Sequence, residues 1–101
     1  MIVVRNIFRA RFGKAKEVTE LLKQGLAISQ RAGFEKGKTR LLTDVAGEAF
    51  YTFVLETTHD SLSQWEQASH AVRSNAEWRA WYQQLTPHIE SGERTIYSVI
   101  E

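Results

Sequence analysis

Residues 2–12 read IVVRNIFRARF and alternate between two faces along their whole length. The more apolar face carries Val4, Asn6, Phe8, Ala10 and Phe12. The opposite face mixes aliphatic side chains with arginines, in the order Val3, Arg5, Ile7, Arg9 and Arg11. A period of two is typical of a β-strand with one buried face. We therefore expect a strand that ends at Gly13 and turns its apolar row toward the core.

The next three segments give a helix and a hairpin. Residues 14–32 predict a helix, because apolar residues recur along one stripe, at Val18, Leu21, Leu22, Gly25 and Ile28. Residues 38–45 and 48–57 have strand-like composition and are separated by the turn signal Ala46-Gly47. Together these two segments predict a β-hairpin.

The rest of the chain predicts a broken helix and a last strand. Ser61 and Gln64 match a capping box, so a helix is expected from there to about Ser74. Asn75 has the character of a second N-cap, and the helix that it opens must end at Pro87. Residues 94–100, RTIYSVI, predict the last strand.

The order β-α-β-β-α-β over residues 1–101 indicates one α+β domain of ferredoxin-like type. In this fold an antiparallel sheet places strand one between strands three and four, and the helices cover one face. The uncovered face would carry Val3, Ile7, Phe50 and Val54, a patch too apolar to stay bare. We expect homodimerisation through this face, with Glu48 and Glu56 pairing with arginines of strand one.

Composition limits the classes of partner and cofactor. The net charge is only +1, with a basic first 40 residues and an acidic remainder, so we expect internal charge pairing and no nucleic-acid partner. The chain has no Cys and three isolated His, which predicts no metal site. No phosphate loop or GxSxG motif occurs, and no cofactor is expected. No signal-like or membrane-spanning run occurs, so a cytoplasmic protein without membrane contact is expected.

A family resemblance rests on short motifs spread over nearly the whole chain. They are Arg5-Asn6-Ile7-Phe8-Arg9-Ala10, Gly13-Lys14-Ala15, Trp65, Trp78, Trp81, Pro87 and Ile96-Tyr97. With them the chain resembles the dimeric α/β-barrel superfamily and within it the NIPSNAP branch, followed by the antibiotic-biosynthesis-type monooxygenases. The resemblance implies a sheet-to-sheet dimer with a small cavity between sheet and helices in each subunit. Members include cofactor-free oxygenases, heme-degrading enzymes and proteins without known activity, so the fold leaves function open.

Asn6 is the first candidate site residue, because it is the polar member of an apolar, helix-facing row. A buried amide needs partners, which a cavity or the backbone can supply. In heme-degrading and some oxygenase relatives an Asn of this strand faces the substrate pocket, which implies the same for Asn6. The alternative is a structural Asn saturated by the backbone. We expect Asn6 to face a cavity beside at least one tryptophan of the second helical region.

The other candidates are aromatic residues and one histidine. Trp65, Trp78, Trp81 and Tyr82 would wall a pocket for a small apolar or aromatic ligand, or else simply form core. His70 is a candidate general base or pocket-lining group, and Tyr51 is a candidate hydroxyl donor to the same cavity. His59 and His88 are expected at the surface. The histidine by which the heme-degrading relatives hold heme corresponds to Asn75 here, which speaks against heme.

Three functions remain open from the sequence. The first is a NIPSNAP-like small-molecule-binding protein that acts as a cofactor-independent oxygenase, with Asn6, His70 or Tyr51 stabilising a substrate anion that reacts with oxygen. The second is a non-catalytic binding or regulatory homodimer. The third is an assembly module whose pocket is filled by core. An open cavity with convergent polar groups would favour the first two.

Overall fold

The computed structural model describes all of residues 1–101. Its elements run in the order β-α-β-β-α-α-β, because the second helical region is broken in two. The strands are β1 (Ile2–Ala10), β2 (Thr39–Thr43), β3 (Thr52–His59) and β4 (Ile89–Ser98). The helices are α1 (Ala15–Ala32), α2 (Leu62–Arg73) and α3 (Ala76–Leu85), with short 3-10 turns at Lys36–Lys38 and Thr86–His88.

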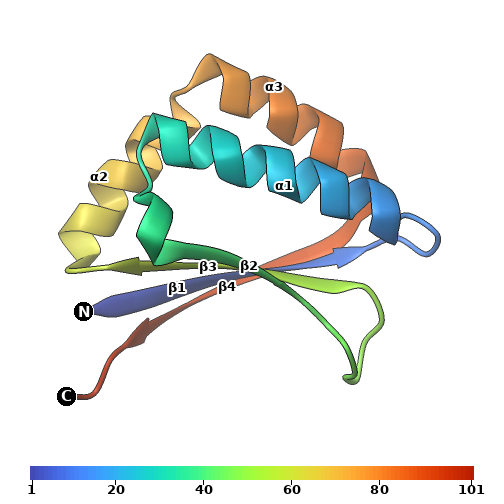
Figure 1. Cartoon of the computed structure of the whole chain (residues 1–101), viewed down its shortest axis with the longest axis horizontal. Coiled ribbons are helices and arrows are strands. Elements are labelled where there is room, and N and C mark those ends of the chain that lie inside the picture. Colours follow the sequence, from blue (N-terminus) through green and yellow to red (C-terminus); the bar gives the residue numbers. More distant parts are fainter.

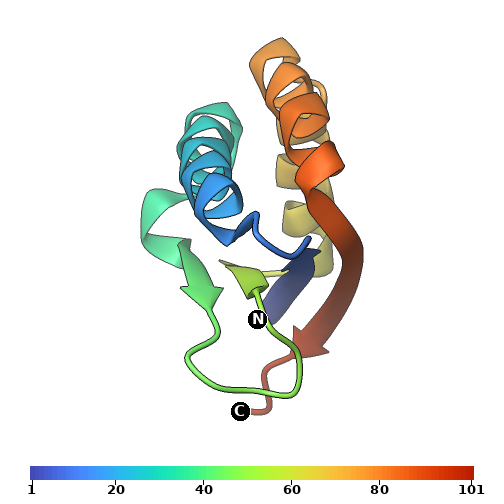
Figure 2. The same cartoon turned by 90° about the vertical axis from the view of Figure 1, so that its right-hand side faces the viewer.

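The four strands form one antiparallel sheet in the order β2-β3-β1-β4. All three helices lie on one side of this sheet, as Figures 1 and 2 show. The predicted α+β ferredoxin-like fold is therefore confirmed, with strand one between strands three and four. In the sheet, Asn6 of β1 lies opposite Leu55 of β3 on one side and Arg94 of β4 on the other. None of the three helices has both the length and the apolar composition that a membrane-spanning helix needs.

The core lies between the sheet and the helices. Its main cluster of buried side chains comes from β1, α1, β3 and α3 and comprises Ala10, Val18, Leu22, Ile28, Phe53, Trp81 and Leu85. At the centre of the contact between α1 and α3, Gly25 faces the indole ring of Trp81, with no space for a side chain between them. The Trp81 Nε1 group also donates a hydrogen bond to the Leu21 carbonyl oxygen at 2.6 Å. This contact fixes the two helices side by side above the sheet.

Two side-chain caps explain why the second helical region is broken. The Ser61 Oγ accepts a hydrogen bond from the Gln64 backbone N–H at 3.2 Å and opens α2. The Asn75 Oδ1 accepts one from the Trp78 backbone N–H at 3.0 Å and opens α3. Each cap satisfies a backbone donor that the first turn of a helix leaves free. Both predicted helix starts are confirmed, and the Asn75 side chain is engaged as a cap.

Some strand boundaries differ from those expected. The strand expected over 48–57 begins at Thr52, because Tyr51 has a φ of 59° and lies in the left-handed region, which interrupts extended backbone. The strand expected over 94–100 begins already at Ile89 and ends at Ser98. The first strand ends at Ala10, and Gly13, with a φ of 81°, forms the turn into α1.

The sheet face without helices carries an ion-pair cluster around the buried carboxylate of Glu56. Glu56 of β3 accepts hydrogen bonds from the Arg5 Nε at 2.9 Å and from the Arg40 Nε at 2.8 Å. The Arg40 guanidinium, helped by Arg5, lowers the pKa of the Glu56 carboxyl although burial opposes this. The predicted pairing of Glu56 with strand one is thus confirmed. Glu48 makes no ion pair, because it lies in the exposed loop before β3.

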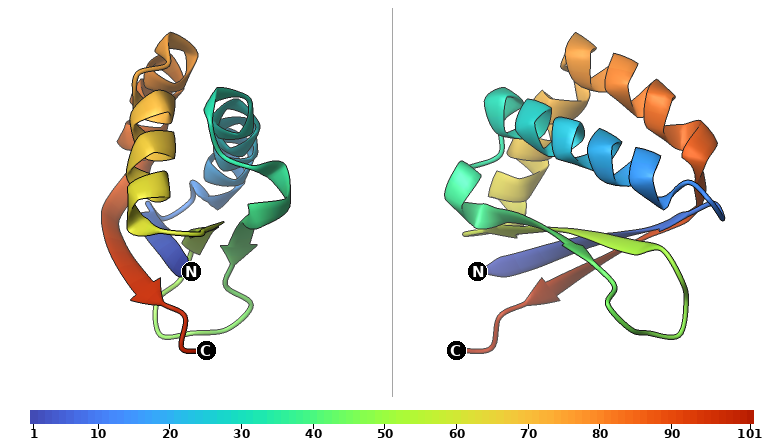
Figure 3. Two further views of the ribbon diagram at one scale, coloured as in Figure 1. Left: turned by 90° about the vertical axis from the view of Figure 1, so that its left-hand side faces the viewer. Right: turned by 45° about the vertical axis from the view of Figure 1, so that its right-hand side comes forward.

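Apolar side chains surround this ion-pair cluster on the uncovered face. Alternation along the strands places Val3, Ile7, Leu42, Val54 and Tyr97 on the same face as Glu56. Leu42 and Tyr97 are 39% and 50% exposed. The loop 44–51 extends to this side of the sheet, away from the helices (Figures 1 and 3). Phe50, expected within the strand, lies in that loop and is exposed.

Candidate functional site

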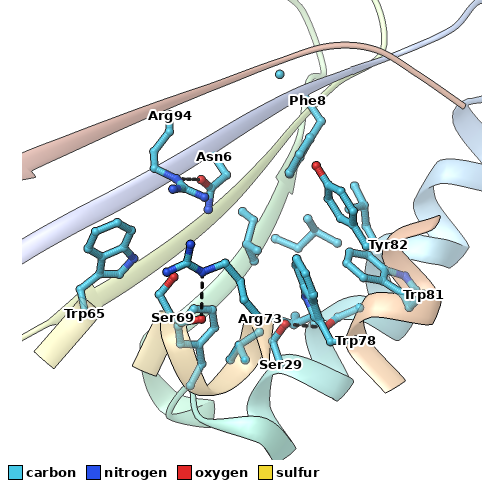
Figure 4. A pocket seen from close by; sticks show the side chains of 18 of the residues that line it. Asn6, Phe8, Ser29, Trp65, Ser69, Arg73, Trp78, Trp81, Tyr82 and Arg94 are labelled. Carbon is cyan, nitrogen blue, oxygen red and sulfur yellow. Dashed lines mark hydrogen bonds between the residues drawn. The ribbon is translucent and has the colours of Figure 1, made fainter. Parts of the chain in front are cut away.

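An open cavity of about 640 Å³ lies between the helix-covered face of the sheet and the helices. A volume of this size is within the usual range for small-molecule sites. Figure 4 shows residues from the sheet on one side and from the helices on the other. The residues that line it include Asn6, Phe8, Leu55, Trp65, Ser69, Arg73, Trp78, Trp81, Tyr82 and Arg94.

One end of the cavity is polar and is organised by Asn6 and Arg94. These two residues lie opposite each other on β1 and β4, so their side chains project from the same face of the sheet. The Arg94 Nε donates a hydrogen bond of 2.7 Å to the Asn6 Oδ1. The Arg94 guanidinium carbon also lies 5.4 Å from the centroid of the Trp65 ring, a cation–π distance. Asn6 thus has a side-chain partner within the cavity and is not saturated by the backbone.

A second arginine reaches the polar end from α2. The Arg73 Nε donates a hydrogen bond of 3.3 Å to the Ser69 carbonyl oxygen, one turn earlier in the helix. In Figure 4 its guanidinium points into the cavity, toward Asn6 and Arg94. Trp65, Ser69 and Arg73 share one side of α2, because they are spaced by four residues. The helix therefore presents an indole and a guanidinium together.

The other end of the cavity is aromatic and comes from α3. The rings of Trp78 and Tyr82 stack with centroids 5.0 Å apart and an interplanar angle of 17°. The ring of Trp81 lies 5.9 Å from that of Trp78 and is only 8% exposed. Figure 4 shows Phe8 opposite this group, on the sheet side. The arrangement provides flat apolar surfaces that suit a planar ligand.

No carboxylate or imidazole side chain faces into the cavity. Glu93 borders it, but lies opposite Ile7 in the β1–β4 pairing, and this register directs its side chain to the uncovered face. Nowhere in the chain do three His, Asp or Glu side chains converge as they would around a metal ion. The chemistry that the cavity itself offers is therefore cation and hydrogen-bond stabilisation at one end and ring contact at the other.

The structure brings together five of the seven predicted site residues. Asn6, Trp65, Trp78, Trp81 and Tyr82 all border the cavity, so Asn6 faces a cavity that tryptophans of the second helical region also line. Trp81 also belongs to the buried core, so it packs the interior and borders the cavity at the same time. Whether these residues bind a ligand stays a prediction.

His70 and Tyr51 lie outside the cavity, which corrects their predicted placement. His70 is exposed on α2, because five residues after Trp65 correspond to a rotation of about 140° around the helix axis. Tyr51 lies in the loop before β3 and packs edge-on against Phe12, with ring centroids 5.4 Å apart. Neither side chain borders the cavity.

His59 is buried, against the expectation of a surface position. It is 9% exposed, and its Nε2 lies 2.9 Å from the Thr57 Oγ1. Burial lowers the pKa of His59, and the nearby Lys38 charge acts in the same direction. Its ring packs edge-on against Phe34, with centroids 5.6 Å apart. His59 is therefore part of the packing between β3 and the chain after α1.

Arg73 and Arg94 are the site residues that sequence reasoning missed. For Arg73 a signal existed, because Trp65, Ser69, Val72 and Arg73 recur at i, i+4, i+7 and i+8 along α2. For Arg94 the signal was the register between β1 and β4, which places it opposite Asn6. That register is a tertiary property and is not visible in the sequence of either strand.

Comparisons with known proteins agree on the fold. No family model matches the chain, and no curated protein matches it. Among solved structures, it is similar to a NIPSNAP family protein from Agrobacterium tumefaciens str. C58, with a TM-score of 0.86 at 24% identity. That match covers 99% of this chain and 93% of the other.

Two oxygenases are also similar in structure. An antibiotic biosynthesis monooxygenase gives a TM-score of 0.75 at 10% identity, with all of both chains covered. SnoaB, a cofactor-independent oxygenase from Streptomyces nogalater, gives 0.69 at 12% identity and covers 99% of this chain and 93% of its own. At such identities the likeness concerns the fold. The chain therefore has the fold of the NIPSNAP-family proteins, which antibiotic-biosynthesis monooxygenases share.

Proposed function

We propose that the protein binds a small, flat, largely apolar molecule in the cavity between its sheet and helices. The observation that carries this proposal is an open cavity of about 640 Å³ with stacked rings at one end and convergent polar groups at the other. A module that served only for assembly would have no need of such a space, since side chains normally fill protein interiors. The aromatic walls favour a planar ring system as ligand.

Oxygenase chemistry without a cofactor is the more specific form of this proposal. The similarity in fold to a cofactor-independent oxygenase supports it, as does the cation of Arg94 beside Asn6, which would stabilise an ionised phenol. In such a reaction the substrate supplies the electrons: 1,5-dihydroxynaphthalene and O2 would give 5-hydroxy-1,4-naphthoquinone and water. The alternative is a non-catalytic binding protein that uses the same cavity.

One experiment with 1,5-dihydroxynaphthalene tests both the proposed ligand binding and the proposed oxygenase activity. Under argon, the compound should bind and quench tryptophan fluorescence, and Tyr82→Ala should weaken binding about tenfold because the ring stack is lost. Gln84→Ala, on the exposed side of α3 and outside the cavity, is the matched control. When oxygen is admitted, enzyme-dependent formation of the quinone would indicate an oxygenase, and its absence a binding protein. Undetectable binding under argon would contradict the proposal itself.

We also propose that two subunits associate through their uncovered sheet faces. The apolar side chains around the Glu56 cluster, including the half-exposed Tyr97, give this face the character of an interface. Stable interfaces of obligate dimers bury about 2,000 Å² or more, and a four-stranded sheet face has room for this.

Sedimentation velocity should therefore show a dimer at low micromolar concentration. Val54→Lys, which places a charge in the middle of the uncovered face, should produce monomers, because an unpaired buried charge is costly. Ala27→Lys, on an exposed position of α1, is the control and should remain dimeric. A wild-type monomer at this concentration would contradict the proposal.

A further inference from the structure

The cavity has two chemically different ends, and each suits a different part of one ligand. Arg73, Arg94 and Asn6 gather at one end, while Phe8, Trp78 and Tyr82 line the other (Figure 4). A ligand that satisfied both ends would be amphipathic, with a polar group on one side of a flat apolar body. The charged side chains at the polar end of the cavity indicate which charge the polar group of the ligand carries.

The two arginines of the cavity have no carboxylate partner. Three arginines outside the cavity are paired with carboxylates, since Arg5 and Arg40 hold Glu56 and Arg31 holds Glu77. The remaining arginines outside the cavity, Arg9, Arg11 and Arg79, are exposed and form no ion pair. Arg73 and Arg94 make no ion pair, and the only carboxylate bordering the cavity, Glu93, lies on the strand position that points to the opposite face. Two like charges in one cavity repel each other, and an anion between them would relieve that repulsion.

Each guanidinium is oriented by its Nε and leaves its terminal nitrogens free. The Arg94 Nε is engaged by the Asn6 Oδ1, and the Arg73 Nε by the Ser69 carbonyl oxygen. No hydrogen bond within the protein uses the Nη atoms of either residue. A guanidinium held in this way presents the pair of Nη donors that matches the two oxygens of a carboxylate. Asn6 is thus a positioning residue for Arg94.

We propose, resting on the binding function proposed above, that the natural ligand is a flat aromatic acid whose carboxylate lies between Arg73 and Arg94. Its ring then extends from the indole of Trp65 toward the Trp78–Tyr82 stack. Trp65 would contact the ligand where its carboxylate joins its ring, because the Trp65 ring already lies against the Arg94 guanidinium. The site therefore selects for negative charge as well as for a planar shape.

A matched pair of probe molecules separates selection for negative charge from selection for a planar shape. 2-Naphthoate and 2-naphthamide have the same ring and nearly the same size, but only the first is an anion. Isothermal titration at neutral pH should show 2-naphthoate binding at least about tenfold more tightly than 2-naphthamide. Equal affinities would overturn the inference of an acid ligand and leave the proposed binding function standing. Failure of both probes to bind would overturn both.

Variants of Arg73 and Arg94 test whether these two residues cause the preference for 2-naphthoate over 2-naphthamide. The double variant Arg73→Met/Arg94→Met should abolish the preference, so that 2-naphthoate binds no more tightly than 2-naphthamide. Arg79→Met, an exposed residue of α3 outside the cavity, should keep the preference. Far-ultraviolet circular dichroism checks that each variant is folded, and Arg94→Lys serves as a milder second variant that should retain part of the preference. A preference that survives in the folded double variant would overturn the assignment.

Discussion

Replacement of Trp81 by alanine should lower the free energy of unfolding by about 3–5 kcal/mol, the usual cost of removing a large aromatic side chain from a core. Trp81 is 8% exposed, belongs to the main buried cluster and bridges α3 to α1 through its hydrogen bond to the Leu21 carbonyl oxygen. The variant would lose this bond, its ring contacts and the support of the cavity wall. Urea titration followed by circular dichroism, at one fixed protein concentration, measures the change.

Trp78→Ala is the matched comparison for this prediction. From the sequence, Trp78 and Trp81 were both expected either to wall a pocket or to form core. The structure leaves Trp78 half-buried at the cavity and stacked on Tyr82, while Trp81 lies in the core. Trp78→Ala should therefore cost only about 1–2 kcal/mol. A larger loss of stability for Trp78→Ala than for Trp81→Ala would contradict this division of roles.

Gly25→Ala should destabilise the protein by about 3 kcal/mol, although alanine favours helices over glycine by about 1 kcal/mol. A methyl group at this position would overlap the six-membered ring of Trp81, which cannot move aside because its Nε1 is bonded to α1 and its surroundings are buried. The helices would have to separate, and the cavity between helices and sheet would change shape with them. Thermal and urea unfolding both report the loss.

Two controls make the Gly25 prediction specific. Gly37→Ala adds the same methyl group where no atom lies within 4 Å, so stability should change by less than about 0.5 kcal/mol. In a Trp81→Leu background, the cost of Gly25→Ala should shrink, because the clashing ring is absent and contacting residues are energetically coupled. An undiminished cost in that background would show that Gly25 is required for another reason.

Local signals were sufficient to predict most of the fold. The alternation over residues 2–12 and the helical stripe at Val18–Ile28 reflect packing on one face, which imposes a period on the sequence. The caps Ser61 and Asn75 act within three residues of themselves, so their role was visible without any tertiary information. Both helices began where these residues indicated.

The errors occur where burial imposes no pattern. Residues 89–93, IESGE, belong to β4 but lack alternation, because β4 is an edge strand that is exposed along almost its whole length. The start of β3 was missed because a single left-handed residue, Tyr51, ends the loop despite its strand-like composition. Hydrophobic periodicity reports burial, and where both faces are exposed the signal disappears.

The candidate site was predictable in part for the same reason. Asn6 was conspicuous as a polar residue within an apolar row, and the aromatic residues of α3 were conspicuous by their spacing. Arg73 and Arg94 were not, because charged residues on exposed segments are common and only the register of β4 and the position of α2 direct these two into one cavity. Convergence of distant segments is a property of the tertiary structure alone.

The central position of β1 has a consequence for the order in which a growing chain can fold. Of the four strands of this sheet, β1 is synthesised first, yet one of its two neighbours is β4, which is synthesised after the other three. Until residues 89–98 have left the ribosome, one edge of β1 has no hydrogen-bonded partner strand. The sheet must therefore close after synthesis of β4, through contacts between the two ends of the sequence, which makes closure slow compared with helix formation. An unpaired strand edge during this interval is where a chaperone would act.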